Sequence, residues 1–157
     1  MYNRVAENDN KMITLKRLRS CSIFWSLFIG IGALLGAVMM FTDPSGKIWK
    51  MEPILPLLQV LPFSDVLFQN FVFPGIALLF ANGITNFVSF ILIRKNHRYA
   101  ALSVMICGIV LIFWITVQFV IFDFNFMSNL YFFFGLFQFL TGYGYWKSTK
   151  YFLKDVK

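Results

Sequence analysis

Four long apolar segments dominate the pattern of hydrophobic and polar positions along the chain. They cover about residues 20–42, 71–93, 99–122 and 127–146, and none of them contains Asp, Glu, Lys, Arg or His. A helix needs about 20 predominantly apolar residues to cross the hydrocarbon core of a bilayer. The pattern therefore predicts an all-α membrane protein, a four-helix transmembrane bundle over residues 20–146.

The connection at 43–70, between the first two spans, is the only long one. It begins Asp43-Pro44-Ser45-Gly46, which places Asp, Pro and Gly where a type I turn favours them. Residues 51–62 follow, and they are apolar but too short and too rich in proline to span a bilayer. We therefore expect a short interfacial or re-entrant external loop between the first two helices.

Basic residues are distributed unevenly among the connections. Twelve of the 14 Lys and Arg residues lie in an N-terminal arm at 1–19, in the turn at 94–98 or in a C-terminal tail at 147–157. Loops rich in Lys and Arg stay on the cytoplasmic side of a membrane. The arm and the tail are therefore both predicted to be cytoplasmic. The formal net charge of +7 then points to anionic lipid and not to nucleic acid.

Composition narrows the possible chemistry. Charged residues make up only 13% of the chain, against about 25% in soluble domains. No ionisable residue lies in a predicted span, which argues against a proton relay and against intramembrane aspartyl catalysis. Cys21 and Cys107 are far apart and His97 sits in the basic turn, so the sequence suggests no zinc site. We expect no metal and no cofactor, and the balance leans away from an enzyme.

Small and polar residues recur on one face of each predicted helix. In lipid, close packing of small residues and polar contacts hold helices together, so these faces are expected to point inward. By span, they are Trp25, Gly32, Gly36 and Met39; Gly75, Asn82, Asn86 and Ser89; Ser103, Cys107, Trp114 and Gln118; and Tyr131, Gly135, Gln138, Gly142 and Tyr145. Helix packing is assigned to Gly32, Gly36, Gly75, Gly135 and Gly142. Gly32 and Gly36 form a GxxxG match, which serves either a contact within the bundle or a dimer.

Two interpretations of the polar interior remain open. The amides of Asn82, Asn86, Gln118 and Gln138 either hydrogen-bond one another and hold the bundle together, or they line a pocket. In the second case Trp114 and Tyr131 would form its walls. The candidate ligand-binding residues are Asn82, Asn86, Trp114, Gln118, Tyr131 and Gln138.

Several local motifs support a resemblance over about residues 32–142. They are Asp43-Pro44-Ser45-Gly46, Pro62-Phe63-Ser64-Asp65, Phe73-Pro74-Gly75, Asn82-Gly83-Ile84-Thr85-Asn86 and Trp114-Ile115-Thr116-Val117-Gln118. With them, the chain resembles a widespread group of small bacterial four-span membrane proteins. More loosely, its architecture is similar to that of the DoxX-like proteins, from which no functional residue carries over. The resemblance implies a four-helix bundle in a bacterial plasma membrane and no particular reaction.

Three classes of function follow from these observations. The first is a non-enzymatic membrane protein that binds a hydrophobic or lipid-like ligand, or a membrane protein partner, through the bundle interior or the outer loop. The second is a small transporter or channel component, which would need a continuous wet path past the buried amides. The third is a membrane enzyme acting on lipid or quinone. A homo-oligomer is compatible with each of them.

Overall fold

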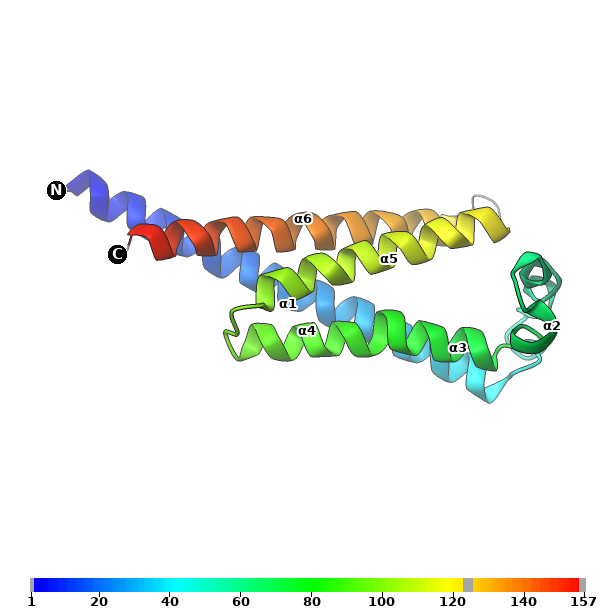
Figure 1. Ribbon diagram of the computed structural model, residues 1–157. Helices are drawn as coiled ribbons and strands as arrows, with labels where there is room; N and C mark the ends of the chain where they lie inside the picture. Colours follow the sequence, from blue (N-terminus) through cyan, green and yellow to red (C-terminus); the bar gives the residue numbers. More distant parts are fainter. Residues whose placement is uncertain (1, 123–125, 156–157) are drawn as a thin grey trace.

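The computed structural model describes residues 2–122 and 126–155, with side chains at 9–121 and 126–151, and this part of the chain is helical without strands. Its long elements are α1 (Tyr2–Thr42), α5 (Ala100–Phe122), α6 (Phe126–Asp155) and a rod built from α3 (Val72–Leu78), the π-helix η3 (Leu79–Ile84) and α4 (Thr85–Arg94). Figure 1 shows these rods side by side. Both termini and the α4–α5 turn lie at one end, the terminal end. The segment 43–71 lies at the other, the loop end.

Three helical segments are long and apolar enough to cross a bilayer in the described part of the chain: Asp9–Thr42, Val72–Arg94 and Ala100–Ile121. The sequence pattern predicts a fourth at 127–146, within α6. That helix is less apolar, because glycines, tyrosines and the amides of Asn129 and Gln138 dilute its phenylalanines. The described residues of the predicted arm are helical, since α1 begins at Tyr2 and continues into the first span without a break. The expected α5–α6 connection falls on residues 123–125, outside the described residues.

The loop between α1 and α3 consists of short turns. Its helical pieces are η1 (Glu52–Ile54), η2 (Pro56–Val60) and α2 (Ser64–Leu67). Proline stands in the first turn of η1 and of η2, where its missing N–H costs no helical hydrogen bond. The backbone N–H of Phe71 donates to the carbonyl of Pro44 at 2.9 Å and so joins the two ends of the loop. The loop thus stays close to the ends of the rods (Figure 1).

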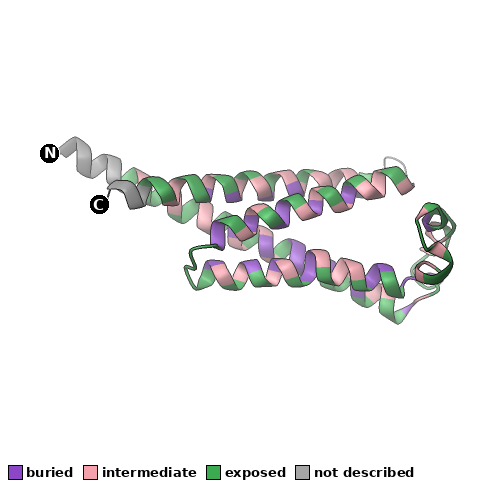
Figure 2. Cartoon of the chain, viewed as in Figure 1, coloured by how far each residue is buried: buried purple, intermediate pink, exposed green. Residues whose placement is uncertain are grey.

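Unlike in a soluble protein, many exposed side chains of these helices are large and apolar, and several buried ones are polar. Ser22 and Ser26 of α1 are fully buried, whereas Val120 is 81% exposed and Phe113 is 68% exposed. Figure 2 shows exposed positions along the outer sides of the rods and buried ones between them. In water, a protein loses about 25 cal/mol of stabilisation for each Å² of apolar surface that it leaves exposed. The outer surface is therefore suited to an apolar solvent, and the interior combines polar and small residues with larger apolar ones such as Ile29 and Leu111.

Glycine allows α5 and α6 to approach each other closely. A Cβ on Gly108 would lie 2.6 Å from the backbone nitrogen of Phe139, and one on Gly142 would lie 2.8 Å from that of Met105. Gly135 faces the same contact, where its Cβ would meet Ile112 at 2.9 Å. The two backbones therefore touch at these positions, and any side chain would force them apart.

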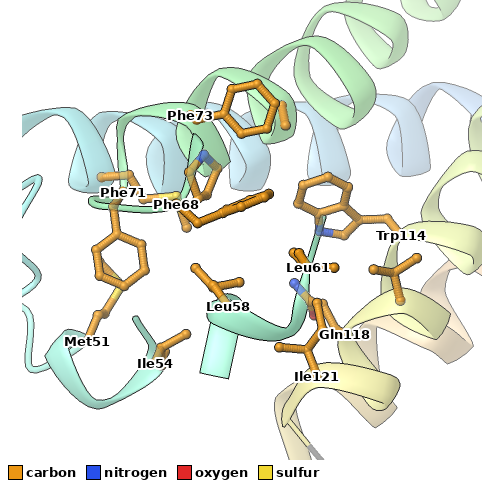
Figure 3. A pocket seen from close by; sticks show the side chains of 14 residues that line it. Met51, Ile54, Leu58, Leu61, Phe68, Phe71, Phe73, Trp114, Gln118 and Ile121 are labelled. Atoms are coloured by element: carbon orange, nitrogen blue, oxygen red, sulfur yellow. The ribbon is translucent and has the colours of Figure 1, made fainter. Parts of the chain in front are cut away.

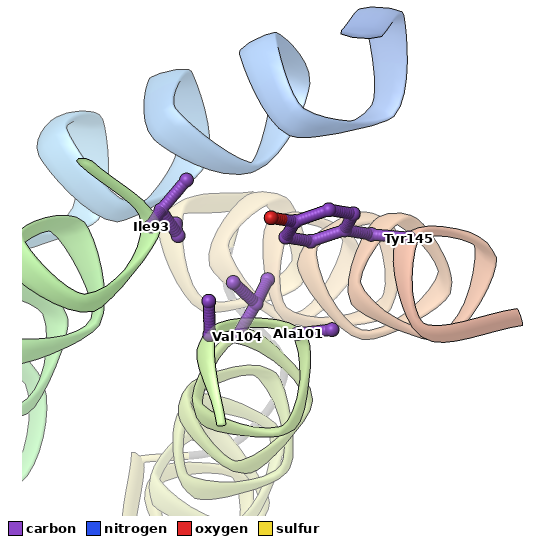
Figure 4. Packing of buried hydrophobic residues seen from close by; sticks show 5 residues of the cluster. Ile93, Ala101, Val104 and Tyr145 are labelled. Carbon is purple, nitrogen blue, oxygen red and sulfur yellow. The ribbon is translucent and has the colours of Figure 1, made fainter. Parts of the chain in front are cut away.

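At the terminal end, α4, α5 and α6 share a small apolar cluster. Ile93, Val104 and Tyr145 pack together there with Ala101, and Figure 4 shows the ring of Tyr145 reaching from α6 toward Ile93. The guanidinium of Arg19, on α1, donates to the backbone carbonyl of Ile93 at 3.1 Å. The same carbonyl, in the last turn of α4, also accepts from the N–H of Asn96 at 3.2 Å. The bond from Arg19 is therefore an additional one, and it ties α1 to the cluster.

The Asp43 turn expected from the sequence is confirmed. The N–H of Gly46 donates to the carbonyl of Asp43 at 3.0 Å, and the Asp43 carboxylate accepts hydrogen bonds from the Ser45 hydroxyl at 2.8 Å and from the N–H of Ile48 at 2.7 Å. Burial alone would raise the pKa of this carboxyl. The hydrogen bonds from Ser45, Trp49 and Ile48 outweigh that effect and hold its pKa below the ordinary value of 3.8.

This hydrogen-bonded turn predicts an acid-sensitive loop. Because the pKa of Asp43 is lowered in the folded state, its contribution to stability is complete above the ordinary pKa and is lost as pH falls through the folded value. We expect Trp49 fluorescence to report a loosening of the loop below pH 3.8. In an Asp43→Asn variant that transition should be absent. An unchanged transition in the variant would show that it does not arise from Asp43.

Candidate functional site

Polar side chains form a column through the interior of the rods, beginning nearer the terminal end. The hydroxyl of Ser26 on α1 donates to that of Ser89 on α4 at 3.4 Å. The hydroxyls of Ser89 and Ser103 on α5 are 3.0 Å apart. All three come from different helices, so this part of the column ties α1, α4 and α5 together.

Asn86 and Gln138 form the next part of the column. The Gln138 amide Nε2 donates to Oδ1 of Asn86 at 2.6 Å, and both residues are 0% exposed. Asn86 in turn donates through Nδ2 to the backbone carbonyl of Asn82 at 2.8 Å. These bonds join α4 to α6. They match the interpretation in which the buried amides hold the helices together.

The helix that carries Asn82 is widened at this level. Residues Leu79–Ile84 form a π-helix between α3 and α4, an irregularity that occurs frequently at functional sites. Two side-chain hydrogen bonds stabilise this π-helix. The hydroxyl of Thr85 donates to the carbonyl of Ala81 at 2.5 Å, and Asn86 donates to that of Asn82. Such side-chain bonds satisfy irregular backbone where no water reaches it.

Asn82 lies at the end of the column, where its backbone carbonyl accepts from Asn86 but its side chain makes no hydrogen bond. Its side chain is 1% exposed, and neither Nδ2 nor Oδ1 has a hydrogen-bond partner in the described part of the protein. An unpaired buried polar group costs about 1–3 kcal/mol, and most buried polar groups in proteins are paired. Asn82 thus carries an unpaired donor and an unpaired acceptor next to the space that it helps to line.

That space is a cavity of about 360 Å³, the inner cavity. Its walls are mostly apolar, and its polar groups are few. The lining residues are Ile29, Gly32, Ala33, Gly36, Met40, Met51, Leu78, Asn82, Leu111, Trp114, Ile115, Gln118, Met127, Ser128 and Tyr131. Gln118 accepts a hydrogen bond from the Ser128 hydroxyl at 3.2 Å. Gly32 leaves room in this wall, since a Cβ there would meet only the Tyr131 hydroxyl oxygen at 3.4 Å, whereas a Cβ on Gly36 would meet the Leu78 side chain at 3.0 Å.

A second cavity of about 280 Å³, the loop cavity, lies beneath the loop. Figure 3 shows Trp114 and Gln118 of α5 facing Leu58 and Leu61 of the loop across it. It is lined by Met40, Met51, Ile54, Leu58, Leu61, Phe68, Phe71, Phe73, Pro74, Ala77, Trp114, Val117, Gln118 and Ile121. Met40, Met51, Trp114 and Gln118 line both cavities. The two spaces are therefore neighbours that share one wall.

The structure divides the six candidate ligand-binding residues into two groups. Asn82, Trp114, Gln118 and Tyr131 line the inner cavity, whereas Asn86 and Gln138 are bonded to each other and line neither cavity. Among the glycines assigned to packing, Gly135 and Gly142 lie on the α5–α6 contact, and Gly75 would meet Phe41 at 2.8 Å if it carried a Cβ. Gly32 and Gly36 border the inner cavity, and Gly36 also packs against Leu78, which a Cβ there would meet at 3.0 Å.

Some residues of the site are not among the sequence candidates. The loop side chains Met51, Leu58 and Phe71 line the loop cavity, and Gly108 makes the closest α5–α6 approach. On α1 the buried face carries Ser22 and Ser26, beside the face expected from Trp25 and the glycines. The apolar composition of residues 51–62 indicates that Met51 and Leu58 pack against something, because a fully exposed loop is rarely this apolar.

The arrangement has the form of a binding site for a small molecule. Ligand cavities are typically lined by apolar and aromatic side chains with a few polar groups that fix orientation. In the described residues, no cluster of three or more His, Cys, Asp or Glu side chains could hold a metal ion. Comparison with protein-family models, with curated proteins and with solved structures finds no match to this chain.

Proposed function

We propose that the chain is a four-helix integral membrane protein that binds a hydrophobic or lipid-like small molecule between its helices at the loop end. In this proposal α6 is the fourth span. The observation that carries it is Asn82, a buried amide with both polar groups unpaired beside an apolar cavity of about 360 Å³. An unpaired amide in such a place is costly for the protein alone and useful when a ligand pairs with it.

The charge distribution supports an orientation with both termini in the cytoplasm. Arg94, Lys95 and Arg98 lie in the α4–α5 turn, at the terminal end, where Lys147 and Lys150 of α6 also stand. The ammonium of Lys150 lies 4.0 Å from the ring centre of Trp146. Trp together with basic residues is typical of a membrane–water interface. The loop and both cavities would then face the outer side of the plasma membrane.

The contacts of the amides favour binding over transport. A conducting path would have to pass between Asn86 and Gln138, whose side chains are 2.6 Å apart and fully buried. Opening it would break that bond and leave Nε2 of Gln138 and Oδ1 of Asn86 unpaired in an apolar environment. The inner cavity lies on the loop side of this bond, next to Asn82. Binding from that side leaves the bond intact.

Asn82→Leu is expected to abolish binding while making the empty protein more stable. Leucine removes two unpaired polar atoms and fills part of an apolar cavity, so the free energy of unfolding of the ligand-free protein should rise by about 1 kcal/mol. Native mass spectrometry of gently extracted protein measures the bound molecule, and thermal unfolding in detergent measures the stability. We expect the bound mass in the wild type and its loss in the variant.

Thr116→Val is the matched control. Thr116 is an exposed polar residue of α5 that lines neither cavity and whose hydroxyl bonds only the Ile112 carbonyl, at 2.8 Å. The control should keep the bound mass. Retention of the same mass by Asn82→Leu would contradict the proposed site.

A further inference from the structure

Asn82 also defines the chemistry of a molecule that would complete the site. We infer that the ligand is a neutral amphiphile with a planar head group, in which a carbonyl oxygen stands beside an N–H donor, as in a carboxamide or a lactam. This inference rests on the proposed function and goes further by naming the ligand class. The following observations concern the head group, its charge and its tail.

The head group follows from the free groups of the Asn82 amide. Its Nδ2 can donate two hydrogen bonds and its Oδ1 can accept two, and none of these is used in the described structure. Gln118, the other amide in the described lining, already accepts from Ser128. A partner that both accepts and donates pairs with Asn82 as one amide pairs with another. An ester, an ether or a tertiary amide would satisfy the donor and leave Oδ1 unpaired.

The neutral charge follows from what surrounds the head group. Neither cavity is lined by Asp, Glu, Lys, Arg or His among the described residues. Moving a carboxylate or an ammonium into an apolar site without a counter-charge costs far more than hydrogen bonds to one amide return. A water-filled cavity is also disfavoured, because each buried water needs two to four polar partners and most of these walls are apolar.

The tail follows from the neighbouring loop cavity. Trp114 and Gln118 provide the polar side-chain groups in its described lining, and the remaining walls are Met, Leu, Ile, Val, Phe, Ala and Pro. An apolar cavity of about 150 Å³ already accommodates benzene, and this one measures about 280 Å³. Met40, Met51, Trp114 and Gln118 border both cavities. A molecule with its head at Asn82 would pass these side chains to place a hydrocarbon chain beside Leu58 and Leu61 (Figure 3).

Tritiated decanamide is the probe for this inference, measured against the full chain in lipid nanodiscs. We expect decanamide to bind the wild type about tenfold more tightly than N,N-dimethyldecanamide, which has the same carbonyl and tail but no N–H. That ratio corresponds to one or two hydrogen bonds. Decanoate and decylammonium should compete more weakly still. The preference for decanamide should vanish in Asn82→Leu and persist in Thr116→Val.

The possible failures separate the two proposals. If both amides bind the wild type equally, or if the preference survives Asn82→Leu, the head-group inference is overturned and the cavity remains a hydrophobic site. If no probe binds the wild type more than it binds Gly32→Leu, whose side chain would enter the inner cavity, the proposed function itself fails. A stronger binding of decanoate than of decanamide would also overturn the inference, since it requires a cation near Asn82.

Discussion

Replacing Gly108 with alanine is expected to lower the stability of the protein more than any conservative change on the outside of the helices. The new Cβ would lie 2.6 Å from the backbone nitrogen of Phe139, whereas ordinary contacts begin at 3.4 Å. Neither atom belongs to a flexible side chain, so α5 and α6 must separate. Overpacking of this kind costs about 1–3 kcal/mol. For a chain of this size, the midpoint of thermal unfolding should fall by roughly 2–12 °C.

Gly32→Ala is the control with the opposite sign. Its Cβ would meet only the Tyr131 hydroxyl oxygen, at 3.4 Å, which is an ordinary contact. Alanine in a helix is more favourable than glycine by roughly 0.5–1 kcal/mol, so this variant should be neutral or slightly stabilised. Both midpoints are measured in the same detergent. Equal destabilisation by both changes would mean that α5 and α6 are not in backbone contact at Gly108.

The second large effect is expected at Gly46, in the turn after α1. This glycine has a φ of +74°, and a Cβ there would lie 2.5 Å from the Phe71 ring and 2.8 Å from the backbone nitrogen of Glu52. The left-handed backbone costs an alanine about 1–2 kcal/mol, and the collision adds to it. Because Phe71 is 2% exposed and lines the loop cavity, we expect Gly46→Ala to loosen the loop and to weaken decanamide binding.

Two further variants separate the causes at this position. Asparagine tolerates the left-handed conformation better than alanine does but still carries a Cβ, so Gly46→Asn should recover only the part of the loss that is due to backbone strain. Lys47→Ala, at an exposed neighbouring position, should behave like the wild type. Trp49 fluorescence and protease resistance of residues 43–71 measure the loop. Wild-type behaviour of Gly46→Ala would contradict the packing of Phe71 against this turn.

The interior of the rods was predictable as a set of residues but not as a set of contacts. The spacing of small and polar positions places Asn82, Asn86, Gln118 and Gln138 on inward faces, because helical periodicity alone determines a face. It does not determine which amide reaches which. Asn86 and Gln138 lie 52 positions apart in the chain and are bonded, whereas Asn82, one turn from Asn86, is unpaired.

The glycines illustrate the same difference. A small residue in a lipid-facing chain predicts close packing, and at Gly135 and Gly142 the structure has a backbone of α5 within contact distance. Gly32 is an equally small residue at helical spacing from Gly36, yet it borders a cavity and a Cβ on it would meet only the Tyr131 hydroxyl oxygen at 3.4 Å. Whether a missing side chain brings two helices together or leaves a space depends on the neighbouring helix.

By itself, the sequence determined that the chain is helical, that its outer surface is apolar and that basic residues gather in the arm, one turn and the tail. These properties follow from the amino-acid composition and from the spacing of apolar residues along the chain, and they do not depend on which segments contact each other. Only the tertiary structure decided that the helix widens into a π-helical turn at Asn82, that the loop covers a cavity beside Trp114 and that both polar atoms of the Asn82 side chain stay unpaired. Each of these depends on distances between segments far apart in the chain, and local patterns carry no information about such distances.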